Sequence, residues 1–138
     1  MQTRGRSGAR RLVMQALYQV QISGHDLDEL RGQFRSGTDY QGCDNEYFES
    51  LLQEVCDQRA SLDQDIADCG DIAAEQLDPV ERAVLWLALA EIRFHDDVPL
   101  PVIINEAVEL AKVFGAEGGH RYVNGLLDKA GEKLRAAA

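Results

Sequence analysis

The stretch LDPVERAVLWLALAEIRFH, residues 77–95, decides the fold more than any other part of the sequence. Asp78 precedes Pro79 and is followed by Glu81 at the third helical position. This is the pattern of a helix N-cap, a proline at the first helical position and a capping box. The apolar run 83–90 is far shorter than the roughly 20 residues that cross a bilayer. The stretch therefore predicts a capped, buried helix that ends near residue 95.

Apolar residues at helical spacing recur on both sides of this segment. They predict helices within residues 9–23, 27–34, 44–66, 101–114 and 122–134, with Asp44 as an N-cap and residues 35–43 as a polar, Gly-rich loop. No strand alternation or βαβ spacing is present. The sequence thus predicts an all-α fold, a compact bundle of about six to seven helices that forms one domain over residues 1–138.

Size and composition indicate an ordinary globular protein. The chain has 138 residues, of which 45% are hydrophobic and 28% charged. Its N-terminus lacks the apolar core of a secretory signal. Three cysteines without C-x-x-C spacing argue against a disulfide framework or a zinc site and favour reduced thiols in the cytoplasm. We expect no metal and no cofactor.

The charge is unevenly distributed along the chain. Residues 1–11 contain Arg4, Arg6, Arg10 and Arg11 and no acidic residue. Residues 12–138 hold the other ten basic side chains and all 24 acidic ones, a net charge of −14. Arg10 and Arg11 fall off the apolar stripe of the first helix, so we expect both to face solvent, and residues 1–8 to form a flexible basic arm. Guanidinium groups placed in this way suit a local contact with a polyanion. The alternative is a solvated tail without a partner.

A second candidate site is the Gly-rich connection that leads into the last helix. His120, Arg121 and Tyr122 follow Gly118 and Gly119 there. Arg121 could bind a phosphate and Tyr122 could stack on a base of single-stranded RNA. The alternative is a plain helix connector with Tyr122 in the core. Gly125, inside the helical pattern, fits a close approach of either another helix or a ligand backbone.

Signatures of enzyme chemistry are missing from the sequence. The three histidines are scattered, and there is no H-E-x-x-H motif, nucleophile elbow, P-loop or G-x-G-x-x-G motif. Glu106 and Glu109 form an i, i+3 pair that a solvated helix face explains. Trp86 fits the core, or a helix face that a partner covers. We therefore expect a protein that is not an enzyme.

Taken together, several blocks closely resemble the NusB family of bacterial transcription antitermination factors. The resemblance covers about residues 7–135 and rests on Gln15–Tyr18, Val80–Leu85 with Glu91, Ile104–Lys112, Phe114–Gly115 and Val123–Asp128. It implies two small helical sub-bundles in one compact unit. It also implies binding, together with the ribosomal protein NusE, to the boxA element of nascent ribosomal RNA leaders, and antitermination by RNA polymerase in the cytoplasm.

The resemblance also implies roles for single residues. Arg4, Arg6, Arg10 and Arg11 match the arginine-rich start that contacts RNA in the family. Tyr18, Arg121 and Tyr122 match positions near that surface, and Glu81 matches a position of the NusE interface. The sequence departs from the family at Trp86, where a basic residue is frequent, and at Gly118 and Gly119, where polar or acidic residues are.

Two other functions remain open at this level. One is an RNA-positioning domain related to those of ribosomal RNA methyltransferases, which would need a further α/β domain with a Gly-rich cofactor loop that we do not expect. The other is a protein-interaction bundle that does not bind RNA. The sequence also leaves open whether the free protein is a monomer or a homodimer.

Overall fold

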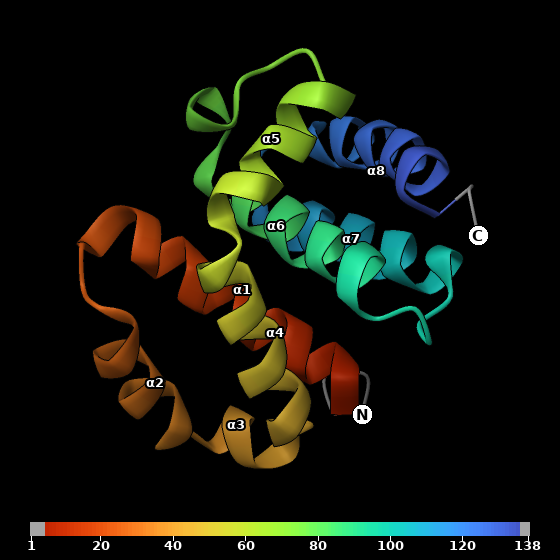
Figure 1. Cartoon of the computed structure of the whole chain (residues 1–138). Coiled ribbons are helices and arrows are strands. Elements are labelled where there is room, and N and C mark those ends of the chain that lie inside the picture. Colours follow the sequence, from red (N-terminus) through yellow and green to blue (C-terminus); the bar gives the residue numbers. More distant parts are fainter. Residues whose placement is uncertain (1–4, 136–138) are drawn as a thin grey trace.

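The computed structural model describes residues 5–135, and this part of the chain is helical almost throughout, with no strand (Figure 1). Its elements are α1 (Gly5–Ser23), α2 (Leu27–Arg35), α3 (Thr38–Gly42), α4 (Asn45–Asp57), α5 (Arg59–Cys69), the 3₁₀ turn η1 (Ala74–Gln76), α6 (Pro79–Phe94), α7 (Leu100–Phe114) and α8 (Gly119–Arg135). The all-α prediction is confirmed. Within residues 5–135 the structure has eight α-helices, where the sequence predicted six to seven.

Both additional helices arise from features that periodicity does not show. The stretch expected to be a loop, residues 35–43, contains the short helix α3, whose Tyr40 packs edge-on against Phe48 at 5.5 Å. The long helix expected over residues 44–66 is divided at Gln58, which leaves the helical region with φ −115° and ψ 21°. The predicted cap is confirmed, since Asp44 accepts a hydrogen bond from the Tyr47 amide at 3.0 Å.

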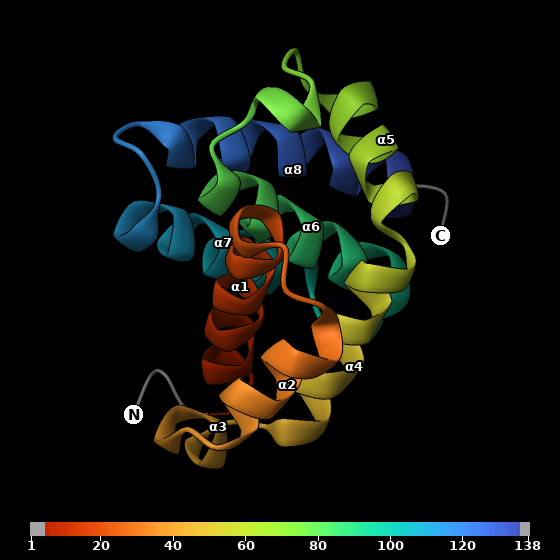
Figure 2. The same ribbon diagram turned by 90° about the vertical axis from the view of Figure 1, so that its left-hand side faces the viewer.

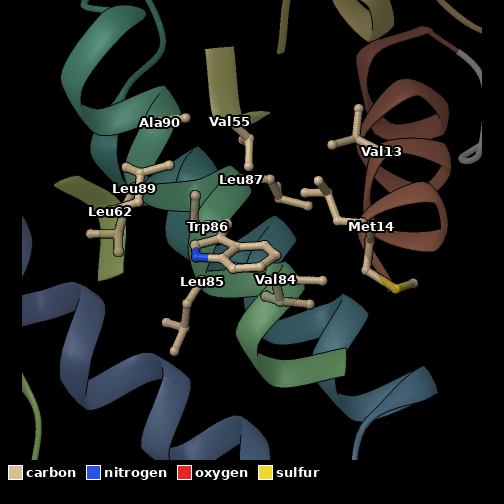
Figure 3. Packing of buried hydrophobic residues seen from close by; sticks show 14 of the residues in the cluster. Val13, Met14, Val55, Leu62, Val84, Leu85, Trp86, Leu87, Leu89 and Ala90 are labelled. Carbon is tan, nitrogen blue, oxygen red and sulfur yellow. The ribbon is translucent and has the colours of Figure 1, made fainter. Parts of the chain in front are cut away.

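Helix α6 is the centre of the molecule. Helices α1 and α4 pack against it from one side, and α5, α7 and α8 from the other (Figures 1 and 2). Every residue from Ala83 to Ile92 is buried. Side chains of α1, α4 and α5 converge on this helix, among them Val13, Val55 and Leu62 (Figure 3). The apolar run of the central segment is thus buried on all sides.

Trp86 lies in the core, fully buried, as one of its two sequence interpretations predicts. Its indole N–H donates to Asp63 Oδ1 at 2.8 Å, so the polar group of the ring is satisfied. The guanidinium groups of Arg59 and Arg82 lie 4.9 and 4.8 Å from the ring centroid. These contacts join α5 to α6.

The predicted start of α6 is only partly a capping box. Asp78 accepts hydrogen bonds from the amides of Val80 (2.8 Å) and Glu81 (3.4 Å), as an N-cap should. The Glu81 side chain does not return to Asp78. It accepts a hydrogen bond instead from the amide of Ala116, in the turn between α7 and α8.

In residues 5–135 no helix has both the length and the apolar character that a membrane span needs. The same residues contain no group of three or more His, Cys, Asp and Glu side chains placed to hold a metal ion.

Candidate nucleic-acid interface

Three of the four N-terminal arginines, Arg6, Arg10 and Arg11, lie in the first two turns of α1 and contact different parts of the fold. Arg4 lies outside the described residues. Residues 5–8, expected to be part of a flexible arm, form the first helical turn. Its start is attached to α4, because the Asp44 amide donates to the Gly5 carbonyl oxygen at 3.0 Å. The arginines of α1 are therefore held by a folded scaffold.

Arg10 is not at the surface, and the expectation that it faces solvent is wrong. Its side chain is 4% exposed. Its Nε lies 3.0 and 2.9 Å from the two carboxylate oxygens of Glu91 on α6, and Nη1 lies 3.0 Å from Glu106 Oε1 on α7. The apolar stripe predicts one covered face of α1, whereas α1 packs against α2, α3, α4 and α6. Burial thus extends beyond the stripe.

The buried ion pair is part of a network. The Tyr47 hydroxyl from α4 donates to Glu91 as well. Burial and the neighbouring Glu91 carboxylate both raise the pKa of Tyr47, which stays protonated. Burial disfavours the charge on Arg10, but the hydrogen bonds and attraction of Glu91 prevail and raise its pKa. The network joins α1, α4, α6 and α7, and it makes Arg10 a structural residue.

Arg6 and Arg11 remain accessible. The Arg6 guanidinium carbon lies 4.3 Å from the centroid of the Tyr47 ring, and its Nη1 lies 3.5 Å from Asp97 Oδ2. Its side chain is 45% exposed. Arg11 is half-buried and lies 5.1 Å from the centroid of Phe114, the last residue of α7. Both groups keep solvent-facing surface that a phosphate could contact.

A hollow on α8 brings the second candidate site together. Its volume is about 230 Å³, and it lies between α8 and the segment that follows α5. The lining residues are Cys69, Gly70, Asp71, Arg121, Tyr122, Gly125, Leu126 and Lys129. Arg121, Gly125 and Lys129 follow one another at four-residue intervals and so lie along one face of the helix. An aromatic ring and two cations therefore surround one concavity.

Tyr122 is held in this hollow by its hydroxyl group. The hydroxyl accepts a hydrogen bond from the Ile72 amide at 3.3 Å. Gly70 is needed for this approach, because a Cβ there would lie 2.2 Å from the Tyr122 hydroxyl oxygen. The ring is half-buried, so it belongs neither wholly to the core nor wholly to the surface.

Lys129 is a candidate that the sequence reasoning missed. Its spacing from Arg121 and Gly125 was the available signal, because residues four apart share a helix face. Gly125 has no atom within 4 Å of where its Cβ would be, so close helix packing does not explain this glycine. The sequence suggested the close approach of either another helix or a ligand backbone, and only the ligand backbone remains.

Arg11 and Arg121 flank the same turn between α7 and α8. Arg11 stacks on Phe114, where α7 ends, and Arg121 lies in the first turn of α8 (Figure 2). Arg6 and Arg10 are directed instead toward Tyr47 and Glu91. Arg11 and Arg121 therefore lie at the two ends of one turn, whereas Arg6 and Arg10 are directed elsewhere.

Tyr18 lies in a different place, a largely apolar groove between α1, the start of α6 and the end of α7. We call it the α1 groove; its volume is about 550 Å³. It is lined by Met14, Gln15, Tyr18, Gln19, Ile22, Ser23, Phe34, Val80 and Phe114. Ile22 is 57% exposed, which is unusual for so large an apolar side chain. The groove has the character of a protein-binding surface.

Glu81 is next to Val80 of the α1 groove but does not face it. Only 7% of the residue is exposed, and Oε2 accepts a hydrogen bond from the Ala116 amide at 3.2 Å. Burial, followed by repulsion from Asp78, raises the pKa of Glu81. The predicted partner contact is thus directed into the turn between α7 and α8.

Comparison with known proteins gives a consistent result. The profile of the NusB family matches residues 7–132. Transcription antitermination protein NusB of Pseudomonas putida (strain W619) is 48% identical over 132 residues, which cover 96% of this chain and 80% of that protein. The same protein of Paraburkholderia phymatum is 45% identical over 130 residues, which cover 94% of this chain and 90% of that one.

Solved structures agree with the fold. NusB of T. maritima superposes with a TM-score of 0.81 at 28% identity, over 93% of this chain and 91% of that one. NusB in a crystal structure with NusE and double-stranded RNA gives a TM-score of 0.79 at 24% identity, over 93% and 96% of the two chains, a likeness of fold alone. With this fold and these relatives, the chain belongs to the NusB family, whose members are transcription antitermination factors and not enzymes.

Proposed function

We propose that this transcription antitermination factor binds, together with NusE, the boxA element of nascent ribosomal RNA leader transcripts, and so promotes antitermination by RNA polymerase in the cytoplasm. The hollow on α8 carries the RNA part of the proposal. Tyr122 offers a ring that is already held in place, and Arg121 and Lys129 offer charge for the phosphates on either side. Stacking on a fixed ring with flanking cations is how single strands are commonly bound.

Arg11 extends this surface across the turn between α7 and α8, and Arg6 and Arg4 add charge at the start of the chain. Arg10 is left out because its charge is paired in the interior with Glu91. Few cations against a body of net charge −14 imply weak binding by the protein alone. A basic partner on the acidic body would supply the missing affinity.

The α1 groove is the surface we assign to NusE. It is apolar, partly exposed at Ile22, and shares Phe114 with the contact of Arg11. A partner seated there would lie beside the RNA-binding turn, so that both proteins could contact one strand. A crystal structure of a NusB protein contains NusE and RNA together, which supports this pairing.

The RNA site is tested by Arg121→Ala and Lys129→Ala, measured against a short single-stranded boxA RNA over a range of salt concentrations. Each lost phosphate contact should weaken binding and reduce the slope of log K against log salt by about 0.7. Lys112→Ala is the matched control, because Lys112 is an exposed cation on α7 outside the hollow. Unchanged affinity and slope in both variants would contradict the assignment.

Deletion of residues 1–11 is a poor test of the arginines, since it also removes the buried Ala9 and Arg10. Single substitutions of Arg6 and Arg11 avoid that loss.

The partner site is tested by Ile22→Asp, with NusE affinity measured by titration calorimetry. A charge in the α1 groove should weaken NusE binding and leave RNA binding by the isolated protein unchanged. Val102→Asp, an exposed apolar position on α7 outside the groove, is the control. Equal NusE affinity in both variants would refute the groove as the docking surface, and would favour binding elsewhere on the acidic body.

A further inference from the structure

Glu81 and Gly119 are packed against each other where α6 begins and α8 begins. A Cβ added to Gly119 would lie 1.8 Å from Glu81 Oε2 and 2.4 Å from its Cδ. A Cβ added to Gly115 would lie 3.2 Å from the same oxygen. Gly119 does not have a positive φ, so its backbone would accept alanine. Glycine at this position leaves the space that the Glu81 carboxylate occupies.

The Glu81 carboxylate is buried without a cation. None of the ion pairs among residues 5–135 includes it, and its hydrogen bond comes from the Ala116 amide at 3.2 Å. It lies at the first residue of α8, where the helix dipole favours a negative charge. A buried charge is costly, and the groups that offset the cost here, the Ala116 amide and the dipole of α8, both belong to the turn and the helix that follows it.

We infer that Glu81 is a positioning residue for RNA binding: its carboxylate holds the turn between α7 and α8, and thereby sets the first turn of α8 with Arg121 and Tyr122. Glu81 itself does not touch the RNA. This inference rests on the proposed function, in which the hollow on α8 binds the strand. It also gives Gly119 a role, as the residue that leaves room for the carboxylate.

A double-mutant cycle tests the coupling. In Gly119→Ala the new methyl group expels the carboxylate, which is the end of a flexible side chain, so the fold is kept while the turn loses its anchor. We expect Gly119→Ala and Glu81→Ala each to weaken RNA binding roughly three- to tenfold. In the double variant the second change should add little, because the contact is already lost. Additive losses would overturn the inference.

Comparison of Glu81→Gln with Glu81→Ala tells whether Glu81 acts by positioning the turn between α7 and α8 or only by stabilising the fold. The amide oxygen of glutamine can still accept the Ala116 N–H, so RNA affinity should stay within twofold of the parent, and the Ala116 amide should remain protected in hydrogen exchange. Glu81→Ala should weaken RNA binding and remove the protection of the Ala116 amide from hydrogen exchange. If Glu81 were only a packing residue, Glu81→Ala would lower the unfolding temperature and leave the RNA affinity of the folded protein unchanged, which would refute positioning.

Two comparisons keep the result distinct from that of the proposed function. Gly32→Ala, at an exposed helical position with no atom within 4 Å, controls for the glycine replacement itself. If Arg121→Ala weakens RNA binding and Gly119→Ala does not, the hollow stands and the positioning role is wrong. If Arg121→Ala has no effect, the hollow is not the RNA site and the inference falls with it. Loss of NusE binding in Gly119→Ala with unchanged RNA affinity would also overturn it.

Discussion

The interior contact of Arg10 and the hollow on α8 place cationic side chains in opposite surroundings. Arg10 is surrounded by Glu91, Glu106 and Tyr47, and its charge is fully paired. Arg121 and Lys129 are exposed on α8 and form no ion pair within the described residues 5–135. Whether a cationic side chain is paired in the interior or left exposed therefore depends on the acids that face it, and not on its position in a basic stretch.

The largest effect should come from breaking the interior contact. Arg10→Ala leaves Glu91 buried without its partner, so the free energy of unfolding should fall by about 3–5 kcal/mol in urea titrations. Arg10→Met combined with Glu91→Leu removes both charges and should recover most of the loss. A loss below about 1 kcal/mol in Arg10→Ala, the range of an exposed ion pair, would contradict the burial of this contact.

The neighbouring arginine should behave in the opposite way. Arg11→Ala should change the free energy of unfolding by less than about 1 kcal/mol, because it removes a half-exposed contact with Phe114. It should weaken RNA binding and reduce the salt slope by about 0.7. Gel-shift titrations at several salt concentrations measure this. A large loss of stability with an unchanged slope would remove the distinction between the two arginines.

Glu81 extends the comparison to acids, since it is buried without the cation that Glu91 has. Its pKa is raised in the folded protein, so the ionised form disfavours folding at neutral pH. Glu81→Gln should therefore be more stable than the parent at pH 7. The difference should shrink as the pH falls and vanish below the ordinary glutamate pKa of about 4.3, where both states of the parent are protonated. Thermal unfolding from pH 3 to pH 8 measures it; a difference independent of pH would contradict this explanation.

The smallest effect concerns Gly125 in the hollow. Gly125→Ala should stabilise α8 by about 0.5–1 kcal/mol, because the added methyl group meets no atom within 4 Å. If a strand approaches the helix there, the same methyl group should weaken RNA binding. Urea titration and RNA titration of one variant give both values. Higher stability with unchanged RNA affinity would show that no RNA strand approaches α8 at Gly125.

Much of the fold was predictable because its signals are local. Asp44 and Asp78 were recognised as helix caps, and both accept the expected amide hydrogen bonds. Helix α3 and the break at Gln58 were missed. The first is held by the packing of Tyr40 on Phe48, and neither changes the apolar spacing.

The site was predicted less well. Arg121 and Tyr122 were placed correctly at the start of the last helix, and whether they bind RNA stays a proposal. Glu81 was expected to face a partner, yet its carboxylate lies against Gly119. Lys129 was overlooked, although its spacing from Arg121 was visible.

The sequence by itself determined most of the helices, the burial of the central segment and the membership of the NusB family. These follow from spacing, caps and motifs that extend over a few residues. Only the tertiary structure decided which charges are paired: Glu91 is 81 positions from Arg10, and the Ala116 amide is 35 from Glu81. Helical periodicity reports which face of a helix is apolar. It does not report which distant polar group lies opposite, because that depends on how the helices pack.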